Sequence, residues 1–418
     1  MSTGEDALDA AHFRRVVLVV AVGIFVTGLG WPGLIGRLPF GLYLKNELHL
    51  PPQDVAAFWA VGTLAWYFKP LAGLVCDSFP LLGTRRRWYL CAGSAASSLL
   101  WIAFAAVPRS YGAMMAVMVA LNAAMVVVST ALGGMLVEEG QKHGATGRLS
   151  SLRMGLEGVM SLVAGPLGGW LASRSFGWTA GAGAAIVFSL APLAFFYARE
   201  PRRARRDNTV WITARRQLDQ IMRSRPMWGA TALLFLVYLA PGFQTPLMYH
   251  QQDILKLDAG TMGLLQFLGG AGALLGAAAY SWLCRRISLY PLLVVGVVLN
   301  AASVLFYLGY HSRTAAMIIE STAGVVGTIG LLPLYDLAVR AAPKGSESFS
   351  YALMMSIRTV AAIAISDVVG SYLYGHVHLR LEQLVWINAG STMAVLLFLP
   401  LLPAALMAGR EGEGATRR

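Results

Sequence analysis

Long apolar stretches alternate with short polar ones along almost the whole chain. Twelve of them have about 20 residues or more, enough for a helix rising 1.5 Å per residue to cross about 30 Å of hydrocarbon. They cover residues 16–44, 55–76, 88–107, 111–137, 150–172, 176–198, 227–249, 260–283, 290–311, 313–341, 346–373 and 383–408. The pattern predicts an all-α membrane protein with twelve transmembrane helices. The polar start of the chain does not resemble a removable signal peptide.

One polar segment is much longer than the others and divides the pattern six plus six. Residues 199–226 hold nine arginines and a surplus of six positive charges. Inside this segment Trp211, Leu218 and Ile221 recur at helical spacing, which predicts an amphipathic helix on anionic inner-leaflet lipids. A site for a regulatory partner is the alternative. We therefore expect an N-terminal half at 1–198, a basic cytoplasmic linker at 199–226 and a C-terminal half at 227–418.

A faint internal repeat supports this division. Residues 334–344 overlay residues 132–142 at an offset of 202, and residues 274–276 overlay residues 71–73 at an offset of 203. Two six-helix halves that run in the same direction are typical of parallel-repeat transporters. The repeat predicts two pseudo-symmetric halves. Within the apolar stretches, the spacing of Gly272 and Gly276 predicts close helix packing rather than chemistry.

Composition and charge exclude several classes of protein. Hydrophobic residues make up 56% of the chain and charged residues 13%, too few charges for a soluble domain. Of the 33 lysines and arginines, 24 fall on the side of the two termini and seven on the other, which predicts cytoplasmic termini in a cell inner membrane. The net charge of +12 is thus explained without nucleic acid.

The sequence carries no pattern for a metal, a cofactor or an enzyme. Cys76, Cys91 and Cys284 form no CxxC pair, so neither a disulfide framework nor a zinc site is expected. We find no phosphate-binding GxxxxGK[ST], no HExxH and no GxSxG. We expect a protein that is not an enzyme, binds no cofactor and functions as a monomer.

Charges inside apolar stretches are costly unless they face water, a partner or a substrate. Lys69 lies in the second stretch, in the string KPLAGLVCDSFPLLGTRRR. Gly73 would let another helix approach closely, and Asp77 follows one turn later, where it can hold a gate. The gating residues expected in this string are Lys69, Gly73, Asp77 and Arg85. The alternative is that the arginines only anchor the membrane surface, and we favour that alternative for Arg86 and Arg87.

This string resembles the signature loop between the second and third spans of the major facilitator superfamily. Its fuller form is similar to the folate–biopterin transporter family, and residues 42–48 and 332–356 resemble two further segments of that family. The resemblance implies the major facilitator fold and alternating-access transport of a small polar or anionic solute, with folate or pterin the leading expectation. Where the family usually carries acidic residues, in the fourth and seventh spans, this chain has residues 128–132 and 241–246, which contain none.

The remaining candidates divide by role. A cavity lined by cations suits an anionic solute. In the superfamily, polar residues on the fourth and seventh spans line the cavity. Trp31 offers a stacking face at the point where glycines and Pro32 loosen the first span. The expected substrate-binding residues are Trp31, Arg37, Asn122, Ser129, Tyr238, Gln244 and Arg358. Glu320 and Asp367 are the expected proton-coupling residues, with interior ion pairing as the alternative.

Four further charges lie where spans end on the cytoplasmic side. We hypothesise that Glu138, Arg153, Asp336 and Arg340 form interhelix ion pairs that are made in one access state and broken in another. The alternative is static surface pairing, worth under about 1 kcal/mol for each pair. The rival functions are a carrier for a sugar, an amino acid or a drug-like compound, a membrane receptor without transport, and a polytopic membrane enzyme.

Overall fold

The computed structural model describes residues 2–79, 81–84, 86–142, 146–198, 209–343 and 346–401. Within these ranges the secondary structure is helical, apart from an isolated bridge between Leu81 and Thr84. Nine helical segments in the described ranges, the first Arg87–Ala106 and the last Leu381–Pro400, are long and apolar enough to cross a membrane. The expected all-α membrane protein is confirmed, and the count of twelve spans stays a prediction.

The other three expected spans also form helices, but two of them are split into shorter helices and the third carries charged residues. The stretch 16–44 is split between α1 (Ser2–Leu29) and α2 (Arg37–Asn46). The stretch 55–76 is split among α3 (Pro52–Gly62), α4 (Leu64–Tyr67) and α5 (Lys69–Ser78). α8 (Thr146–Ala172) is continuous, but its first half carries charged residues that interrupt its apolar character.

The chain forms two compact units. The N-terminal unit contains Met1–Tyr43 and Gly62–Ala214, and the C-terminal unit contains Leu44–Val61 and Arg215–Arg418. The segment 44–61 therefore belongs with residues far along the chain, and the boundary between the units falls inside α2. The expected division into 1–198, 199–226 and 227–418 does not assign residues 44–61 to the C-terminal half, and it stays a prediction.

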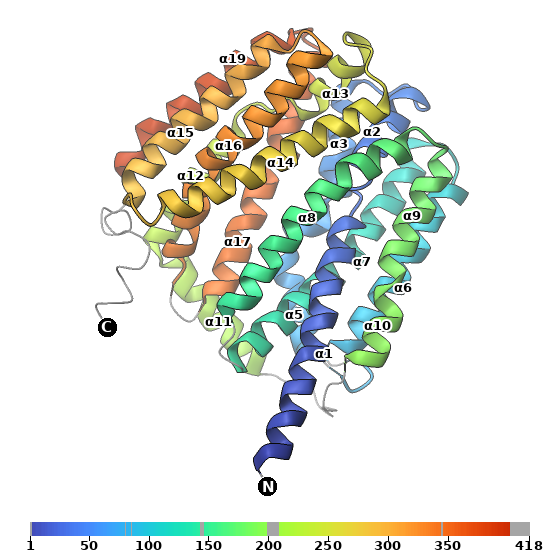
Figure 1. The fold of residues 1–418 in the computed structure, drawn as a ribbon, viewed down its shortest axis with the longest axis vertical. Helices are drawn as coiled ribbons and strands as arrows, with labels where there is room; N and C mark the ends of the chain where they lie inside the picture. Colours follow the sequence, from blue (N-terminus) through green and yellow to red (C-terminus); the bar gives the residue numbers. More distant parts are fainter. Residues whose placement is uncertain are drawn as a thin grey trace. The chain divides into compact units, whose positions relative to one another are not determined.

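In the N-terminal unit, long helices pack side by side. α1 packs against α7 (Tyr111–Lys142) and α8, and α6 (Arg87–Ala106) packs against α7, α9 (Phe176–Phe188) and α10 (Leu190–Tyr197), as Figure 1 shows. Apolar side chains fill the space among α1, α6, α7 and α10. The fully buried ones include Val19, Leu90, Val128 and Leu190.

The break between α1 and α2 follows from local sequence. Pro32 has no backbone N–H, and the glycines around it tolerate turns that other residues avoid. Residues 30–36 form turns, in which the Trp31 N–H donates to the Gly28 carbonyl at 3.2 Å and the Leu34 N–H donates to the Trp31 carbonyl at 2.9 Å. The Trp101 indole donates to the Gly30 carbonyl at 3.0 Å. The predicted loosening of the first span is confirmed.

In the C-terminal unit, α16 (Arg313–Ala341) lies between α14 (Ala259–Leu283) and α15 (Leu289–Leu305), and α19 (Leu381–Ala394) packs on α15 (Figure 1). Glycines bring α14 and α16 into backbone contact. A Cβ on Gly272 would lie 2.2 Å from the Ser321 carbonyl oxygen, and one on Gly276 would lie 2.5 Å from the Val325 carbonyl oxygen. The close packing predicted from this glycine spacing is confirmed.

A second break separates α12 (Arg225–Leu239) from α13 (Gln244–Asp253). The backbone groups at this break bond to neighbouring helices. The Gly242 N–H donates to the Ser366 carbonyl at 2.9 Å, and the Asn388 amide donates to the Pro241 carbonyl at 2.9 Å. Ser366 lies in a π-helical segment, η2 (Val360–Asp367), between α17 (Glu347–Thr359) and α18 (Val368–Gly375). Irregular backbone is tolerated at membrane depth where protein covers it in this way.

The basic linker is described from residue 209 onward. α11 (Thr209–Met222) covers part of the expected amphipathic helix. Ile221 is buried against the core of α12 and α15, whereas Leu218 and Met222 are exposed. The helix is therefore confirmed, and its contact with lipid stays a prediction. Residues 199–208 lie outside the described residues.

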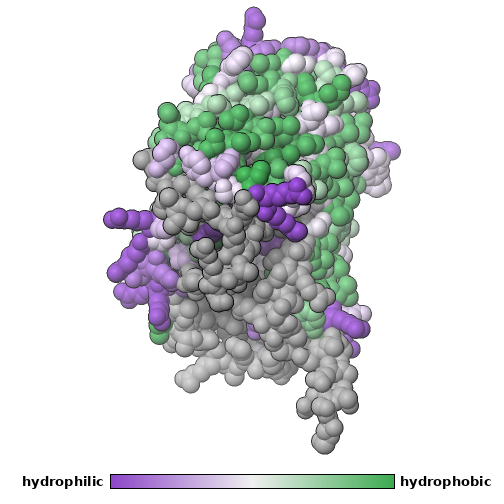
Figure 2. Space-filling model, turned by 60° about the vertical axis from the view of Figure 1, so that its left-hand side comes forward, coloured by the Kyte–Doolittle hydropathy of each residue, from purple (hydrophilic) through white to green (hydrophobic). Residues whose placement is uncertain are grey.

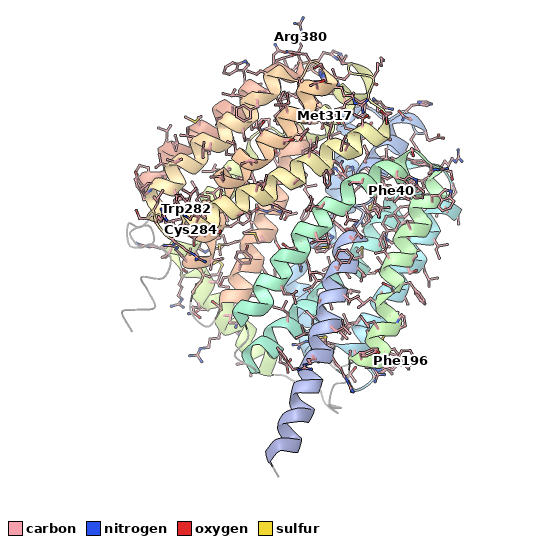
Figure 3. The ribbon with its side chains drawn as sticks, in the orientation of Figure 1. Phe40, Phe196, Trp282, Cys284, Met317 and Arg380 are labelled. Carbon is pink, nitrogen blue, oxygen red and sulfur yellow. The ribbon has the colours of Figure 1, made fainter. Side chains whose placement is uncertain are left out.

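The surface is apolar over a wide area. Figure 2 shows a broad hydrophobic surface in the upper part of the view, with hydrophilic side chains mostly at its margins. Exposed apolar side chains on α15 and α19 include Val295, Val298 and Trp386. In Figure 3, Arg380 lies at one end of the C-terminal unit, and Trp282 and Cys284 lie at the other end. Such a surface fits contact with lipid tails rather than water.

The start of α14 allows a test of stability. The Asp258 carboxylate accepts hydrogen bonds from the Thr261 hydroxyl at 2.6 Å and the Thr261 backbone N–H at 3.0 Å. These bonds lower the pKa of Asp258. Its carboxylate therefore stabilises the fold above the unfolded-state pKa of about 3.9, and this stabilisation is lost as pH falls through the lower folded-state pKa.

Replacing Asp258 by alanine is expected to cost about 1 kcal/mol near neutral pH, the usual value of a lost helix cap. Asp258→Asn should retain most of the stability, because asparagine caps helices equally well, and should remove this residue's share of the acid dependence. Thermal unfolding of the three proteins across the acidic range measures both effects. A loss in the asparagine variant as large as in the alanine variant at neutral pH would contradict the capping role.

Candidate functional site

One group of candidate residues meets in the N-terminal unit, and we call it the tryptophan–lysine cluster: Trp31, Trp66, Lys69, Asn122 and Ser129. The buried Asn122 amide oxygen accepts hydrogen bonds from the indole N–H of Trp31 at 2.9 Å and of Trp66 at 2.7 Å. The two indole rings meet edge to face, with centroids 5.6 Å apart. A single amide on α7 thus fixes one tryptophan from the break after α1 and another from α4.

Lys69 joins this cluster from the first residue of α5. Its ammonium donates a hydrogen bond to the Ser129 hydroxyl at 2.9 Å and lies 5.0 Å from the centre of the Trp66 ring. Among the described residues, no carboxylate pairs directly with this ammonium. A half-buried cation at membrane depth that pairs directly with no described carboxylate is costly, so it favours an anion that arrives from outside the protein.

The second group lies in the C-terminal unit, and we call it the tyrosine–arginine cluster: Tyr238, Tyr335, Arg358 and Thr359. The Arg358 guanidinium donates to the Tyr335 hydroxyl at 3.1 Å and lies 4.9 Å from the centre of the Tyr238 ring. The Tyr238 and Tyr335 hydroxyls are 2.7 Å apart.

The Arg358 guanidinium also keeps an unused hydrogen-bond donor. Its Nη2 donates to the Thr359 hydroxyl at 3.3 Å, and its buried Nε has no hydrogen-bond partner. In the described part of the chain no carboxylate pairs with it. A guanidinium with unused donors is suited to binding a carboxylate through two parallel hydrogen bonds.

Glu320 lies on α16 and accepts hydrogen bonds from two tyrosines. The Tyr307 hydroxyl donates at 3.1 Å and the Tyr310 hydroxyl at 3.0 Å. The two phenol rings stack with centroids 5.4 Å apart, and Gln251 on α13 donates to the Tyr310 hydroxyl at 2.7 Å. Within the described ranges Glu320 has no cationic partner. The expected alternative, an interior ion pair at Glu320, is therefore not what this structure contains.

Asp367 has a different environment. Its carboxylate accepts the Thr245 backbone N–H at 3.0 Å and the Thr245 hydroxyl at 2.8 Å. Thr245 is the second residue of α13, so Asp367 binds the N-terminus of a helix whose dipole favours a negative charge there. These two hydrogen bonds hold the start of α13 against the π-helical segment η2. A role in proton coupling stays a prediction for this residue.

The expected gate on α5 is partly outside the described residues. Arg85 and the side chain of Asp77 belong to that part. No described atom lies within 4 Å of a Cβ placed on Gly73, so the close helix approach expected at this glycine is not made in this conformation. Arg86, which the sequence favours as a surface anchor, is instead buried and forms an ion pair with Glu138 on α7.

The other expected gate residues pair within their own helices. Arg153 bonds to Glu157 at 2.9 Å on α8, and Arg340 bonds to Asp336 at 2.9 Å on α16, each at a spacing of four residues. Glu138 does make an interhelix pair, but with Arg86 rather than with a member of the expected set. The described ion pairs of Glu138, Arg153, Asp336 and Arg340 thus differ from the expected set, and their role as a gate stays a prediction.

The last two candidates follow helix breaks. Arg37 is the first residue of α2, and the exposed Gln244 is the first residue of α13. Both stay predictions as substrate-binding residues. No group of three or more potential ligands in the described residues could hold a metal ion.

Several residues of these clusters were not expected from the sequence. They are Trp66, Arg86, Tyr307, Tyr310 and Tyr335. One of them, Trp66, had a usable signal in the sequence. Trp66 precedes Lys69 by three residues, a spacing that places side chains on one helix face. Tyr307 and Tyr310 have the same spacing, but nothing in the sequence connects them to Glu320.

The asparagine at the centre of the tryptophan–lysine cluster supports a further prediction. Asn122→Leu keeps the side-chain size but leaves two indole N–H groups without their acceptor, and each such loss costs roughly 1–3 kcal/mol. We expect a lower thermal unfolding temperature and a shifted tryptophan emission. Asn300→Leu is the matched control, because Asn300 is also on a membrane-length helix but makes no side-chain hydrogen bond to a described residue. Equal effects of the two variants would contradict the assigned role of Asn122.

Comparison with known proteins supports the resemblance seen in the sequence. A sequence model of the BT1 family matches residues 32–416. The "Folate-biopterin transporter" of Synechocystis sp. is 26% identical over 399 residues, covering 89% of this chain and 79% of that protein. The "Probable folate-biopterin transporter 7" of Arabidopsis thaliana is 24% identical over 401 residues, covering 89% and 88%.

Solved structures agree on the fold. The crystal structure of a D-xylose-proton symporter matches with a TM-score of 0.71 at 14% identity, covering 94% of this chain and 98% of that chain. The crystal structure of the nucleoside transporter NupG matches with a TM-score of 0.67 at 12% identity, covering 93% and 98%. The expected resemblance to major facilitator and folate–biopterin transporters is confirmed.

Proposed function

Because the chain belongs to the BT1 family, we propose that it is a secondary transporter that moves a folate- or pterin-like solute across a membrane by alternating access. It is a membrane carrier rather than an enzyme. Relatives named as folate–biopterin transporters support this assignment along most of the chain. The assignment of the solute needs a second, chemical argument.

The observation that supports the solute class is the presence of two half-buried cations without described carboxylate partners. Lys69 lies beside the Trp66 ring, and Arg358 lies beside the Tyr238 ring. Each cluster thus joins a positive charge to an aromatic face. Folates combine a flat pterin ring with carboxylates, so either cluster offers a folate both kinds of contact. A neutral sugar would leave both charges uncompensated, which disfavours that rival.

The missing acidic residues of the fourth and seventh spans limit how the pterin ring can be held. Ser129 stands in the fourth span and is bonded to Lys69. We propose that this hydroxyl supplies the polar contact to the ring in place of a carboxylate, and that Trp31, which Asn122 holds in position, supplies a stacking face. Such contacts give orientation with little added charge.

We further propose that transport is coupled to protons and that Glu320 carries the proton. Among the described residues, the Glu320 carboxyl group is bonded to two neutral hydroxyls and to no cation, so no ion pair has to break when a proton binds to it. The Tyr307 and Tyr310 hydroxyls donate to this carboxyl group in the present structure, and hydroxyl groups can also accept a hydrogen bond from it when it is protonated. Asp367, with Thr245 at the N-terminus of α13, is the weaker candidate.

The topology follows the charge distribution. We propose twelve spans in two six-helix halves, with both termini and residues 199–226 on the cytoplasmic side of a cell inner membrane, and with a monomer as the working form. α11 would lie on anionic inner-leaflet lipids. On the same side, the Arg86–Glu138 pair would act with Gly73, Asp77 and Arg85 as the cytoplasmic gate.

Uptake into proteoliposomes tests the function directly. We expect accumulation of a radiolabelled folate or reduced pterin when the outside is made acidic, and no accumulation in empty liposomes. A thermal-shift panel of folates, pterins, sugars, amino acids and nucleosides gives an independent measurement, because a ligand at 100 times its Kd stabilises by about 2.7 kcal/mol. Stabilisation by a sugar or amino acid alone, with no response to folates or pterins, would overturn the proposed solute.

A further inference from the structure

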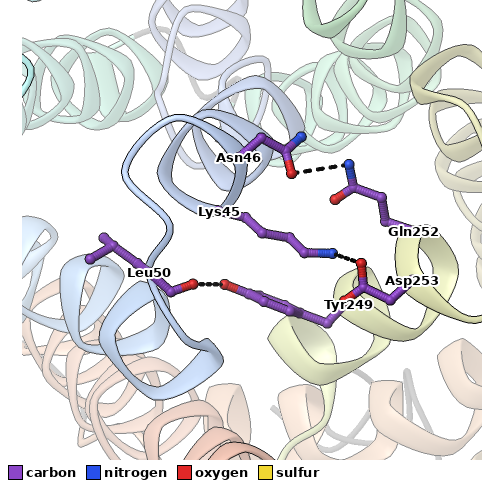
Figure 4. Close-up of polar contacts among 6 residues, drawn as sticks. All are labelled: Lys45, Asn46, Leu50, Tyr249, Gln252 and Asp253. Carbon is purple, nitrogen blue, oxygen red and sulfur yellow. Dashed lines mark hydrogen bonds and ion pairs between the residues drawn. The ribbon is translucent and has the colours of Figure 1, made fainter.

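Residues 44–50, at the end of α2 and in the loop after it, are bonded to the C-terminal half of α13. The two segments are about 200 positions apart in sequence but belong to one compact unit. Figure 4 shows three polar contacts between them. Lys45 forms an ion pair with Asp253 at 2.5 Å, the Gln252 amide donates to the Asn46 side-chain oxygen at 3.2 Å, and the Tyr249 hydroxyl donates to the Leu50 carbonyl.

A fourth contact strengthens the same connection. The Lys45 ammonium lies 4.4 Å from the centre of the Tyr249 ring, so this cation is held by a carboxylate and by an aromatic face at once. The Lys45 side chain is 10% exposed, whereas Asp253 is 53% exposed. One partner is therefore shielded and the other remains open to water. A half-exposed pair of this kind is weak enough to separate and re-form.

The loops on either side are held in unusual conformations. His49 and Lys256 both have a φ of 52°, in the left-handed region that non-glycine residues rarely occupy. The side-chain oxygen of Gln252 is buried without a hydrogen-bond partner. Strain in the flanking loops and an unsatisfied acceptor both oppose the contacts that hold the segment in place. The arrangement therefore has the features of a state that can be left at modest cost.

We propose that Lys45, Asn46, Tyr249, Gln252 and Asp253 form a releasable latch on the non-cytoplasmic side. It is closed in this conformation and must open during each transport cycle. The boundary between the compact units falls inside α2 just before these residues. Opening the latch would free the end of α2 from α13. The proposal rests on the alternating-access function proposed above, and on the orientation that places this loop outside.

Disulfide trapping tests the latch during transport. Asn46→Cys combined with Gln252→Cys places two thiols where the wild-type side chains are in contact. Oxidation is expected to join them and abolish uptake, and reduction should restore it. Each single-cysteine variant, treated in the same way, controls for oxidation of the native cysteines. Full uptake by the cross-linked protein would overturn the latch.

A second measurement needs no solute. Spin labels at positions 46 and 252 are expected to give two distance populations in pulsed electron paramagnetic resonance. The short distance corresponds to the closed latch and the long distance to the open latch. Lys45→Gln should lower the ratio of short to long populations by about 1.5- to 5-fold, the effect of losing an exposed ion pair. Arg223→Gln is the matched control, since it also removes an exposed ion pair, the one with Asp219 on α11.

The two measurements separate the two proposals. A single short population that does not respond to Lys45→Gln would overturn the latch even if uptake of folate is demonstrated. Two populations that respond to Lys45→Gln, together with no uptake of any tested folate or pterin, would overturn the proposed solute and leave the latch supported.

Discussion

Replacing Arg358 by glutamine is expected to weaken folate binding by roughly 10- to 100-fold, the value of a charge-assisted hydrogen bond of about 1.5–3 kcal/mol. The guanidinium has an unused buried Nε and no carboxylate partner among the described residues, so its free donors are available for a ligand. Removing the charge also relieves the cost of burying it. The variant should therefore be at least as stable as the wild type while binding less tightly.

Two further variants make this result specific. Arg358→Lys keeps the charge but loses the planar pair of donors, so its binding should fall between the other two proteins. Arg223→Gln removes an arginine whose side chain is 80% exposed and should leave binding unchanged. Titration calorimetry gives the affinity and thermal unfolding gives the stability. Weaker binding that appears only together with a large loss of stability would indicate a structural role for Arg358.

Glu320→Gln is expected to abolish proton-driven accumulation and to preserve exchange of labelled for unlabelled solute. Glutamine resembles a protonated carboxyl group in shape and in neutrality, so the two tyrosine hydroxyls retain an oxygen acceptor. The carrier would then be fixed in its protonated form. Accumulation under an imposed pH gradient and counterflow without a gradient measure the two properties on the same vesicles.

Asp219→Asn is the matched control for this acid-to-amide change, because Asp219 is exposed on α11 and forms an ion pair with Arg223 on the same helix. It should accumulate solute like the wild type. Equal loss of accumulation and exchange in Glu320→Gln would assign Glu320 to the stability of the fold. Undiminished accumulation would remove it from coupling altogether.

Local features were predictable from the sequence. The break at residues 30–36 follows from Pro32 and its neighbouring glycines, whose backbone preferences act wherever they stand. The contact of α14 with α16 follows from Gly272 and Gly276, because small residues four apart leave a flat surface for another helix. The all-α membrane class follows from hydropathy alone.

Partners across space were not predictable in the same way. Three consecutive arginines, 85–87, offer no local reason for Arg86 to turn inward and pair with Glu138. That choice depends on how α6 is rotated against α7. Tyr335 and Tyr307 are two of 15 tyrosines in an apolar chain, and only the packing of α16 brings them to Arg358 and Glu320. Long-range register decides such contacts, and one sequence does not reveal it.

Side-chain contacts hold α13 at three places along its ten residues. Thr245 is held by Asp367, Gln251 by Tyr310, and Asp253 by Lys45. Successive residues of a helix are rotated by about 100° and advance 1.5 Å, so one inserted or deleted residue would move everything beyond it out of register. Among natural relatives we would thus expect length changes in the loop at 254–258, and none between Thr245 and Asp253. Single side chains of this helix can therefore be substituted separately during evolution, whereas a change in its length would disrupt several contacts at once.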